Sequence, residues 1–416
     1  MSISWVARFG STAAISAVLV IAGNALAGAD VDGFYSAPAP INSTPGNVIR
    51  SEVVSVIVPS LTAVRDGIDA RRVLYQSTGA RGEPIAVSGT VMTPHSAWHG
   101  RGARPLVTYA VGTRGLADRC APSHALTNGT EIDSVAMGAL LDRGFAVAVT
   151  DYEGVGAPGA PTYLNRLSQG HTVLDVARAA QRLPNSGISR TGPVAVYGYS
   201  QGGAGSAAAV ELAPTYAPDL AMVGGVAGAI PSNLATLADR NEGRPFFGAL
   251  GYIFHGLVGA YPDLGKPLDD ALNPQGRDFL RQTADECVVD TLAKHAFGTS
   301  PSLTKSGDTF GDILRSPSFA VAANAQSYGA VAPQVPTLLL QSTSDDTVYY
   351  AQTHQIAHDW CAEGAVVDFK QYDLPPIAPL ADHAVPGVIS VPDAVDWLAS
   401  RFSGLPAPNN CDSVAG

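Results

Sequence analysis

The chain has few of the features that mark nucleic-acid-binding, metal-binding or membrane-spanning proteins. Only 25 of its 416 residues are Lys or Arg against 36 Asp or Glu, a formal net charge of −11. Without a basic stripe to neutralise phosphates, nucleic acid is not an expected partner. Beyond the N-terminus no apolar run reaches eighteen residues, so we expect no stable membrane span. No C-x-x-C motif or Cys/His cluster predicts a metal site.

Charged residues are scarce because the chain is rich in apolar ones. They make up 15% of the sequence, against 46% hydrophobic residues, a balance typical of a globular protein with a large core. The length exceeds one average domain, but it suits a single α/β enzyme domain that carries an insertion.

The first 27 residues have the pattern of a cleaved signal peptide. Arg8 supplies a positive charge, residues 13–22 form a short apolar segment, and Ala25-Leu26-Ala27 is an A-x-A cleavage site. The alternative is an uncleaved anchor, for which the apolar segment is short and rich in alanine. We therefore expect a secreted, extracellular protein that is cleaved after Ala27.

Export gives the cysteines a structural meaning. An even number in an oxidising compartment favours disulfides, and four cysteines allow three different pairings. The four are Cys120, Cys287, Cys361 and Cys411.

Strand and helix patterns alternate along most of the chain. After an irregular arm at residues 28–50, alternating apolar residues at 73–77 and 85–93 predict an antiparallel hairpin. Segments that are apolar throughout, as strands covered on both faces are, lie at residues 105–110, 145–150, 194–197 and 337–341. With helical patterns between them, these segments predict an α/β fold with a mostly parallel, doubly wound sheet.

Residues 233–326 interrupt this alternation. They contain Gly- and Pro-marked turns and candidate helices near 246–258 and 268–294, but no obvious parallel strand. We predict a mainly helical cap inserted between two parts of an α/β-hydrolase core, which span residues 28–232 and 327–416.

Residues 193–203, Pro-Val-Ala-Val-Tyr-Gly-Tyr-Ser-Gln-Gly-Gly, carry the strongest functional signal. An apolar segment runs into Gly198-x-Ser200-x-Gly202, and an Ala-rich helical stretch follows. This is the pattern of the nucleophile elbow, a sharp turn that presents a serine above a sheet. Glycines flank the serine because a Cβ there would collide with the neighbouring strand or helix. Ser200 is the predicted nucleophile.

A serine nucleophile needs a base, and the base needs an acid to orient it. In the order typical of α/β-hydrolases the acid comes next in the chain. Asp345 follows the predicted strand at 337–341 and is favoured because Asp-x-x-Val lets its carboxylate turn inward while Val348 anchors the chain. Asp346 is the alternative.

His383 is the predicted base. It is the histidine of the Pro-rich loop at residues 374–386, after a predicted strand at 368–372. His354 and His358 are spaced like half a zinc site but lack the glutamate of H-E-x-x-H, so an exposed helix face explains them better.

Catalysis also needs donors for the oxyanion of the tetrahedral intermediate. One should be the backbone N–H of Gln201. The other should come from the loop after the strand at 105–110, where we expect Thr113 or Arg114 to supply it. The alternative explanation of that loop is an ordinary glycine turn.

Aromatic residues gather in the predicted cap. Phe246, Phe247 and Phe254 suggest an apolar acyl pocket or lid, although they would equally serve to attach the cap to the core. The sequence favours neither explanation.

Six short motifs give the chain a family resemblance. They are Cys120-Ala121-Pro122-Ser123, Thr150-Asp151-Tyr152-Glu153-Gly154, Gly198–Gly203, Tyr216-Ala217-Pro218, Asp345-Asp346-Thr347-Val348-Tyr349-Tyr350 and Ala381-Asp382-His383. From about residue 33 to the C-terminus the chain resembles the secretory lipase family, the α/β-hydrolases typified by Candida antarctica lipase A and its actinobacterial relatives.

The resemblance implies the roles of Ser200, Asp345 and His383 as nucleophile, acid and base. It also implies the disulfides Cys120–Cys287 and Cys361–Cys411. The chain departs from the family in its oxyanion loop, where Thr113-Arg114 stands in place of an acidic residue, and in its poorly matching cap.

The function expected from these residues is that of a secreted serine ester hydrolase, a lipase or esterase that acts through an acyl-enzyme. Its substrate would be an ester or lipid, dissolved or at a lipid–water interface, and the chemistry needs no cofactor. An acyltransferase would use the same three residues. A degenerate secreted binding protein would lack one of them, and all three are present.

Overall fold

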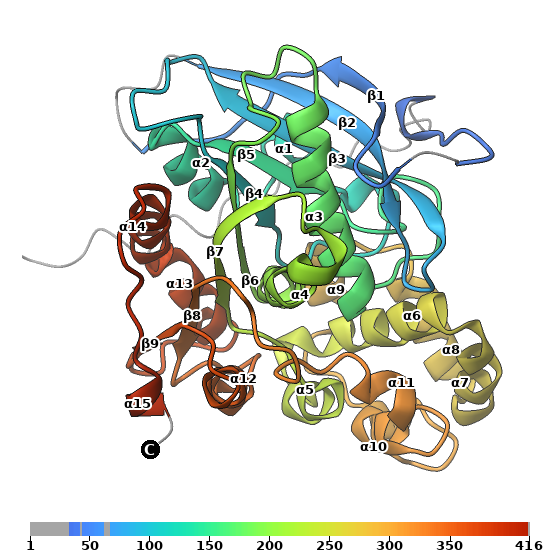
Figure 1. Cartoon of the computed structure of the whole chain (residues 1–416). Helices are drawn as coiled ribbons and strands as arrows, with labels where there is room; N and C mark the ends of the chain where they lie inside the picture. Colours follow the sequence, from blue (N-terminus) through green and yellow to red (C-terminus); the bar gives the residue numbers. More distant parts are fainter. Residues whose placement is uncertain (1–32, 42–43, 62–66, 415–416) are drawn as a thin grey trace, which may run out of the picture. The chain divides into compact units, whose positions relative to one another are not determined.

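A nine-stranded sheet is the frame of the computed structural model, which describes residues 33–41, 44–61 and 67–414 (Figure 1). The strands are β1 (Val48–Val53), β2 (Ile68–Thr78), β3 (Pro84–Pro94), β4 (Leu106–Ala110), β5 (Ala146–Thr150), β6 (Pro193–Tyr199), β7 (Ala221–Gly228), β8 (Thr337–Ser342) and β9 (Val367–Tyr372). Their order is β1-β2-β3-β5-β4-β6-β7-β8-β9. The first three pairings in this order are antiparallel and the other five are parallel.

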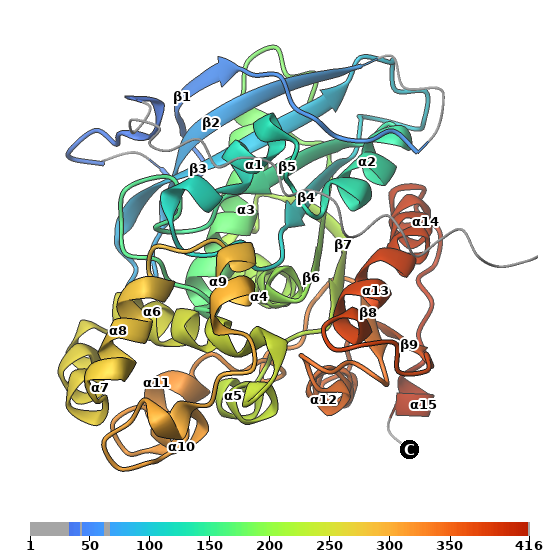
Figure 2. The same ribbon diagram turned by 180° about the vertical axis from the view of Figure 1, so that it is seen from behind.

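Helices cover both faces of the sheet, as the apolar strands require. The helices outside the cap are α1 (Pro122–Asn128), α2 (Ser134–Asp142), α3 (Arg166–Arg182), α4 (Gln201–Tyr216), α12 (Tyr350–Ala362), α13 (Ala381–Ile389), α14 (Val391–Phe402) and α15 (Cys411–Val414). α3 and α4 pack together on one face, and α2 packs with α14 on the other (Figures 1 and 2). Every residue of β4, β5 and β8 is buried between these layers. The predicted doubly wound α/β-hydrolase fold is confirmed.

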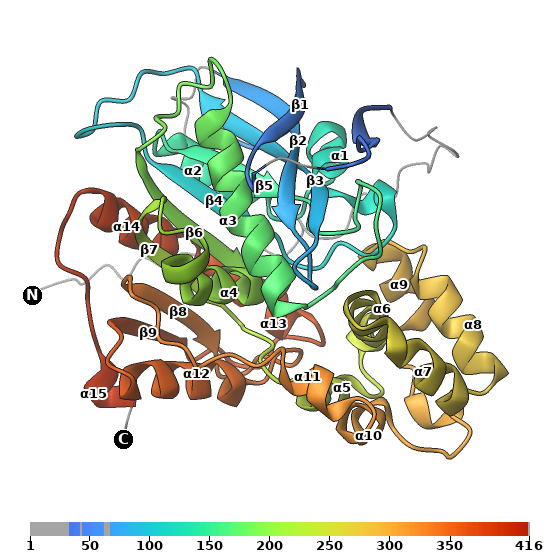
Figure 3. The ribbon, with the colours of Figure 1, turned by 45° about the vertical axis from the view of Figure 1, so that its right-hand side comes forward.

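The cap lies between β7 and β8, as predicted, and is helical. Its α-helices are α5 (Leu234–Asn241), α6 (Leu250–Ala260), α7 (Gly265–Ala271), α8 (Pro274–Thr283), α9 (Val288–His295), α10 (Phe310–Arg315) and α11 (Ala320–Asn324) (Figure 3). Three 3₁₀ helices, η3 (Pro245–Ala249), η4 (Pro262–Leu264) and η5 (Ser300–Ser302), lie between them. A one-residue antiparallel bridge, Gly115 to Cys287, joins the loop after β4 to the cap. Of the helices described, none is long and apolar enough to cross a membrane.

Two predicted elements differ from the structure. The segment at 268–294 forms three helices, because Asn273 caps a new helix that starts with Pro274, and the chain turns again before Val288. Residues 48–50, predicted as irregular arm, belong to β1, which pairs with β2 as an edge strand. Tertiary pairing, not local pattern, decides this short strand. The predicted signal peptide lies outside the described residues.

Two disulfides join distant parts of the described chain. Cys120 is bonded to Cys287 and Cys361 to Cys411, the pairing that the family resemblance implies. The first links the segment after β4 to the cap, and the second links α12 to α15 near the C-terminus.

The start of α4 touches β7 so closely that only glycine fits. A Cβ on Gly203 would lie 2.0 Å from the carbonyl oxygen of Gly228, whereas one on Gly265, in α7, would meet its nearest atom at 3.7 Å. We expect Gly203→Ala to lower the free energy of unfolding by about 1–3 kcal/mol, the usual cost of overpacking. Gly265→Ala should leave it unchanged or raise it by less than about 1 kcal/mol. Urea unfolding measures both, and equal effects would contradict this view of the contact.

Candidate active site

Ser200 stands at a strained turn between β6 and α4. Its backbone has φ 61° and ψ −123°, a conformation that residues with a side chain rarely adopt. The turn is fixed on both sides, since Ser200 N donates to Gly228 O at 2.9 Å and Ser200 O accepts from Ala204 N at 3.0 Å. A Cβ on Gly202 would lie 1.9 Å from Ala110 O, so the flanking glycine is required as predicted.

The structure brings Ser200, His383 and Asp345 into one hydrogen-bonded chain. His383 Nε2 is 2.9 Å from Ser200 Oγ, and His383 Nδ1 is 2.9 and 3.0 Å from the two carboxylate oxygens of Asp345. Asp345 Oδ1 also accepts the N–H groups of Thr347 and Val348, at 3.0 and 2.8 Å. Buried Val348 thus anchors the loop that turns the carboxylate inward.

Asp346 has a different position and a supporting contact. Its Oδ2 accepts the N–H of Leu380 at 2.7 Å, and Leu380 has a positive φ of 69° just before α13. His383 lies in the first turn of α13, so the prediction of a loop around it is corrected: the helix begins at Ala381. Local Pro content obscured this helix, which tolerates Pro386 within it.

Two carboxylates set the charge state of the buried imidazole. Burial lowers the pKa of His383, but Asp345 in contact and Asp346 nearby more than offset this, so its pKa lies above the ordinary value. A neutral His383 that donates from Nδ1 to Asp345 leaves Nε2 free to accept the serine proton.

The backbone amides at the two ends of the loop after β4 are bonded, and those between them are free in the described structure. Gly112 N donates to Asp133 Oδ2 at 2.9 Å, and Leu116 N donates to Glu286 O at 3.2 Å. In the part of the chain that the structure describes, the N–H groups of Thr113, Arg114 and Gly115 have no acceptor. The N–H of Gln201, the first residue of α4, has none either, as is usual in a first helical turn.

The side chains of the two predicted loop donors are engaged elsewhere. Thr113 Oγ1 is 2.7 Å from Tyr163 Oη, and the Arg114 guanidinium is paired with Glu131 and Asp133. The backbone N–H of either residue is available to an oxyanion.

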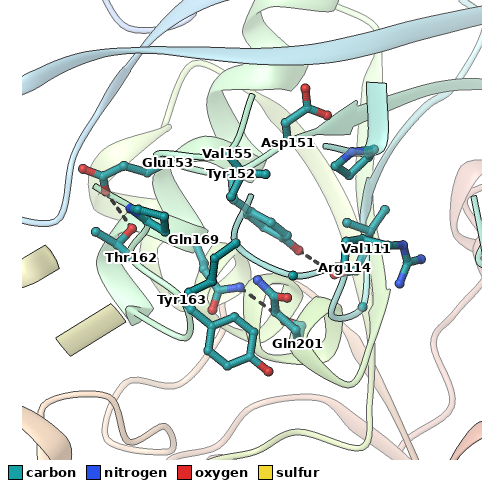
Figure 4. A pocket seen from close by; sticks show the side chains of 15 residues that line it. Val111, Arg114, Asp151, Tyr152, Glu153, Val155, Thr162, Tyr163, Gln169 and Gln201 are labelled. Carbon is teal, nitrogen blue, oxygen red and sulfur yellow. Dashed lines mark hydrogen bonds between the residues drawn. The ribbon is translucent and has the colours of Figure 1, made fainter. Parts of the chain in front are cut away.

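A small pocket lies behind this loop, beside Gln201 (Figure 4). Tyr152, Tyr163 and Gln169 line it, and Gln169 Oε1 is buried without a hydrogen-bond partner. Phe246, Phe247 and Phe254 are not among its lining residues.

Phe247 and Phe254 instead lie in the core of the cap. Both are buried, and their rings lie 6.0 and 5.0 Å from the ring of Phe310. Phe246 is partly buried beside the same core. The structure does not bring these three residues to Ser200, and their part in an acyl pocket stays a prediction.

Asp151 and Tyr152, which directly follow β5, hold neighbouring segments of the site by hydrogen bonds. Tyr152 donates its Oη–H to Val111 O at 2.9 Å, and the Asp151 carboxylate accepts Ser123 N at 2.8 Å and Ser88 Oγ at 2.6 Å. Burial raises the pKa of Asp151 to about 6, although these hydrogen bonds act to lower it.

Among the described residues, no group of three or more His, Cys, Asp or Glu is arranged to hold a metal ion.

Comparison with known proteins identifies the family. The secretory lipase family model matches residues 120–410. The chain belongs to the secretory lipase family. A probable inactive lipase of Mycobacterium tuberculosis is 30% identical over 384 residues, covering 90% of this chain and 82% of the relative. A secreted triacylglycerol lipase of Malassezia globosa, LIP2, is 29% identical over 397 residues, covering 92% and 83%.

Solved structures of a lipase and of an esterase share the fold. Candida antarctica lipase A in its closed state superposes with a TM-score of 0.77 at 24% identity, covering 92% of each chain. The rice cell wall degrading esterase LipA of Xanthomonas oryzae gives a TM-score of 0.72 at 19% identity, covering 86% of this chain and 98% of its own. At these identities the likeness shows the fold alone.

The strained turn at Ser200 predicts that glycine is more stabilising than alanine at this position, the reverse of their order within a helix. Glycine relieves the positive φ whereas alanine keeps the strain, so Ser200→Gly should be more stable than Ser200→Ala by about 1 kcal/mol. At Ser400, in α14, the order should be the usual one, with alanine more stable than glycine. Urea unfolding of the four variants checks this, and the same order at both positions would contradict stored strain at the turn.

Proposed function

We propose that the protein is a secreted serine ester hydrolase of the lipase type. The observation that carries this proposal is the hydrogen-bonded chain from Ser200 Oγ through His383 to Asp345. A serine at an elbow, a histidine in contact and a buried carboxylate behind it are the parts that acyl transfer from an ester requires.

The proposed reaction has two half-reactions. His383 Nε2 takes the Ser200 proton as Oγ attacks the ester carbonyl, and the same proton passes to the alcohol as the carbon–oxygen bond breaks. Water then attacks the acyl-enzyme with His383 again as base, which releases the acid and restores Ser200. Asp345 stabilises the imidazolium in both steps without itself becoming protonated.

The oxyanion of each tetrahedral intermediate needs preorganised donors. We assign the Gln201 N–H as the first of two donors, because Gln201 starts α4 directly after the nucleophile and its N–H has no acceptor in the described structure. The N–H of Thr113 or Arg114 would supply the second.

The proposed substrates are esters of lipids, as in the names of the triacylglycerol lipases that this chain is similar to. Secretion is supported by the signal-peptide pattern, by two disulfides and by relatives that are named as secreted. The relative named a probable inactive lipase makes a non-catalytic protein the alternative. Against it stands the intact contact between Ser200 and His383.

The nucleophile and base can be tested with matched variants. We expect the protein to hydrolyse p-nitrophenyl butyrate and to bind a fluorophosphonate covalently, and Ser200→Ala and His383→Ala to lower kcat by about 10³-fold or more. Ser400→Ala and His358→Ala, at a partly buried and an exposed helical position, should retain wild-type rates. No hydrolysis and no labelling of folded wild-type protein would overturn the proposal.

The raised pKa of His383 predicts the pH dependence. The base acts in its neutral form, so kcat/KM should rise with pH, with a midpoint above the ordinary histidine value of about 6.5. Asp346→Asn removes one of the charges that raise this pKa but keeps an acceptor for Leu380 N, so the midpoint should fall. Asp396→Asn, at an exposed ion pair with Arg143, should not move it. An unchanged midpoint in Asp346→Asn would refute the assigned cause.

A further inference from the structure

The loop of residues 111–116 is held by hydrogen bonds at several points. Tyr152 Oη donates to Val111 O at 2.9 Å, and Val288 N of the cap donates to Arg114 O at 2.8 Å. With the bonds of Gly112 and Leu116 described above, these contacts leave the N–H groups of residues 113–115 free within the described part of the chain, and that of Thr113 comes directly after the bonded Gly112. The N–H of Thr113 donates no hydrogen bond to a strand or to the cap in the described structure.

Behind the loop lies a cluster of two acids and one arginine. Arg114 Nη2 is 2.8 Å from Asp133 Oδ2, and its Nε is 2.9 Å from Glu131 Oε1. The Glu131 side chain is fully buried, and the side chains of Arg114 and Asp133 are 9% and 21% exposed. Glu131 Oε1 also accepts the N–H of Asp133 at 2.9 Å, so it fixes both of its partners.

Such a cluster is a poor way to gain stability. Burying three charges costs desolvation that well-packed apolar residues would avoid. The cluster does, however, deliver one carboxylate oxygen to a backbone amide of the loop, since Asp133 Oδ2 accepts Gly112 N at 2.9 Å. A Cβ on Gly112 would lie 3.6 Å from Tyr199 O, so this amide is directly beside the nucleophile's strand.

We propose that Asp133, held by Arg114 and Glu131, is a positioning residue for the oxyanion hole. By accepting the Gly112 N–H it fixes the orientation of that peptide, and the next free amide, that of Thr113, is thereby held toward the substrate oxygen. The inference rests on the proposed function and adds to it the identity of the second donor and of the group that holds it in place.

The loop also departs from the family pattern in its charged residues. The family resemblance implies an acidic residue within the oxyanion loop, where this chain has Thr113-Arg114. Here the carboxylate comes from Asp133, 21 residues after Gly112 in the sequence, and Arg114 is the residue that binds it. A preorganised donor is worth most when nothing has to reorient during the reaction, which is what this contact provides.

The test compares two substitutions at one position. Asparagine keeps an acceptor for Gly112 N, whereas alanine removes it, so we expect Asp133→Ala to lower kcat by about 10²-fold and Asp133→Asn by less. KM should stay within about threefold, because the oxyanion forms only in the transition state. Binding of a trifluoromethyl ketone, whose adduct with serine carries an oxyanion, should weaken in proportion to kcat.

Controls separate positioning from loss of structure. Asp396→Ala, which breaks an exposed ion pair, should change neither kcat nor ketone binding. The pH midpoint assigned to His383 should be the same in the Asp133 variants as in the wild type, since Asp133 does not contact it. If Asp133→Ala does not fold, Asp133→Asn is compared with the wild type by its kcat and by its affinity for the ketone.

The outcomes distinguish this inference from the proposed function. If the wild type is active and folded Asp133→Ala has the same kcat, or if the Asp133 variants change only in KM, the positioning role is overturned and the hydrolase assignment stays intact. A wild type that neither hydrolyses esters nor reacts with a fluorophosphonate would overturn both.

Discussion

The close contact of the start of α4 with the ends of β4 and β7 is the constraint on which the site depends. Carbonyl oxygens of Ala110 and Gly228 lie where Cβ atoms of Gly202 and Gly203 would be. This contact forces the chain to reverse within one residue, and Ser200 takes the positive φ. Packing of the flanking layers offsets that strain, and the turn leaves the Ser200 hydroxyl in contact with His383.

The parallel sheet then gathers the partners of that hydroxyl. His383 follows Ser200 by 183 residues, yet the two residues are in contact, because Ser200 follows β6, Asp345 follows β8 and His383 follows β9 in the same parallel part of the sheet. Each group is fixed by its own neighbours: Val348 and Thr347 hold the acid, and Tyr199 Oη donates to His383 O at 3.1 Å. The loop after β4 is held in the same way, by Asp133 and by the cap. The geometry is therefore set before any substrate binds.

Much of this arrangement could be predicted from the sequence, and the parts that could not have a common cause. Strand, turn and helix around Ser200 follow from local glycines and apolar runs, and chain order places Asp345 and His383. Edge strand β1 and the helix that carries His383 depend on tertiary contacts that no local pattern reports. The role proposed for Asp133 has no local signal in the sequence, because it depends on a contact with Gly112 across 21 residues. The position of the cap phenylalanines could not be predicted either, because a cluster of aromatic residues along the sequence does not show what each side chain packs against.

In the proposed reaction an acyl group passes through Ser200. Rapid quenching of the protein during turnover of a p-nitrophenyl ester, followed by peptide mass spectrometry, tests it directly. The account predicts a transient increase, equal to the mass of the acyl group, on the peptide that contains Ser200, and none on the same peptide of Ser200→Ala. Steady hydrolysis with no acylated peptide at any time, or acylation at another residue, would contradict it.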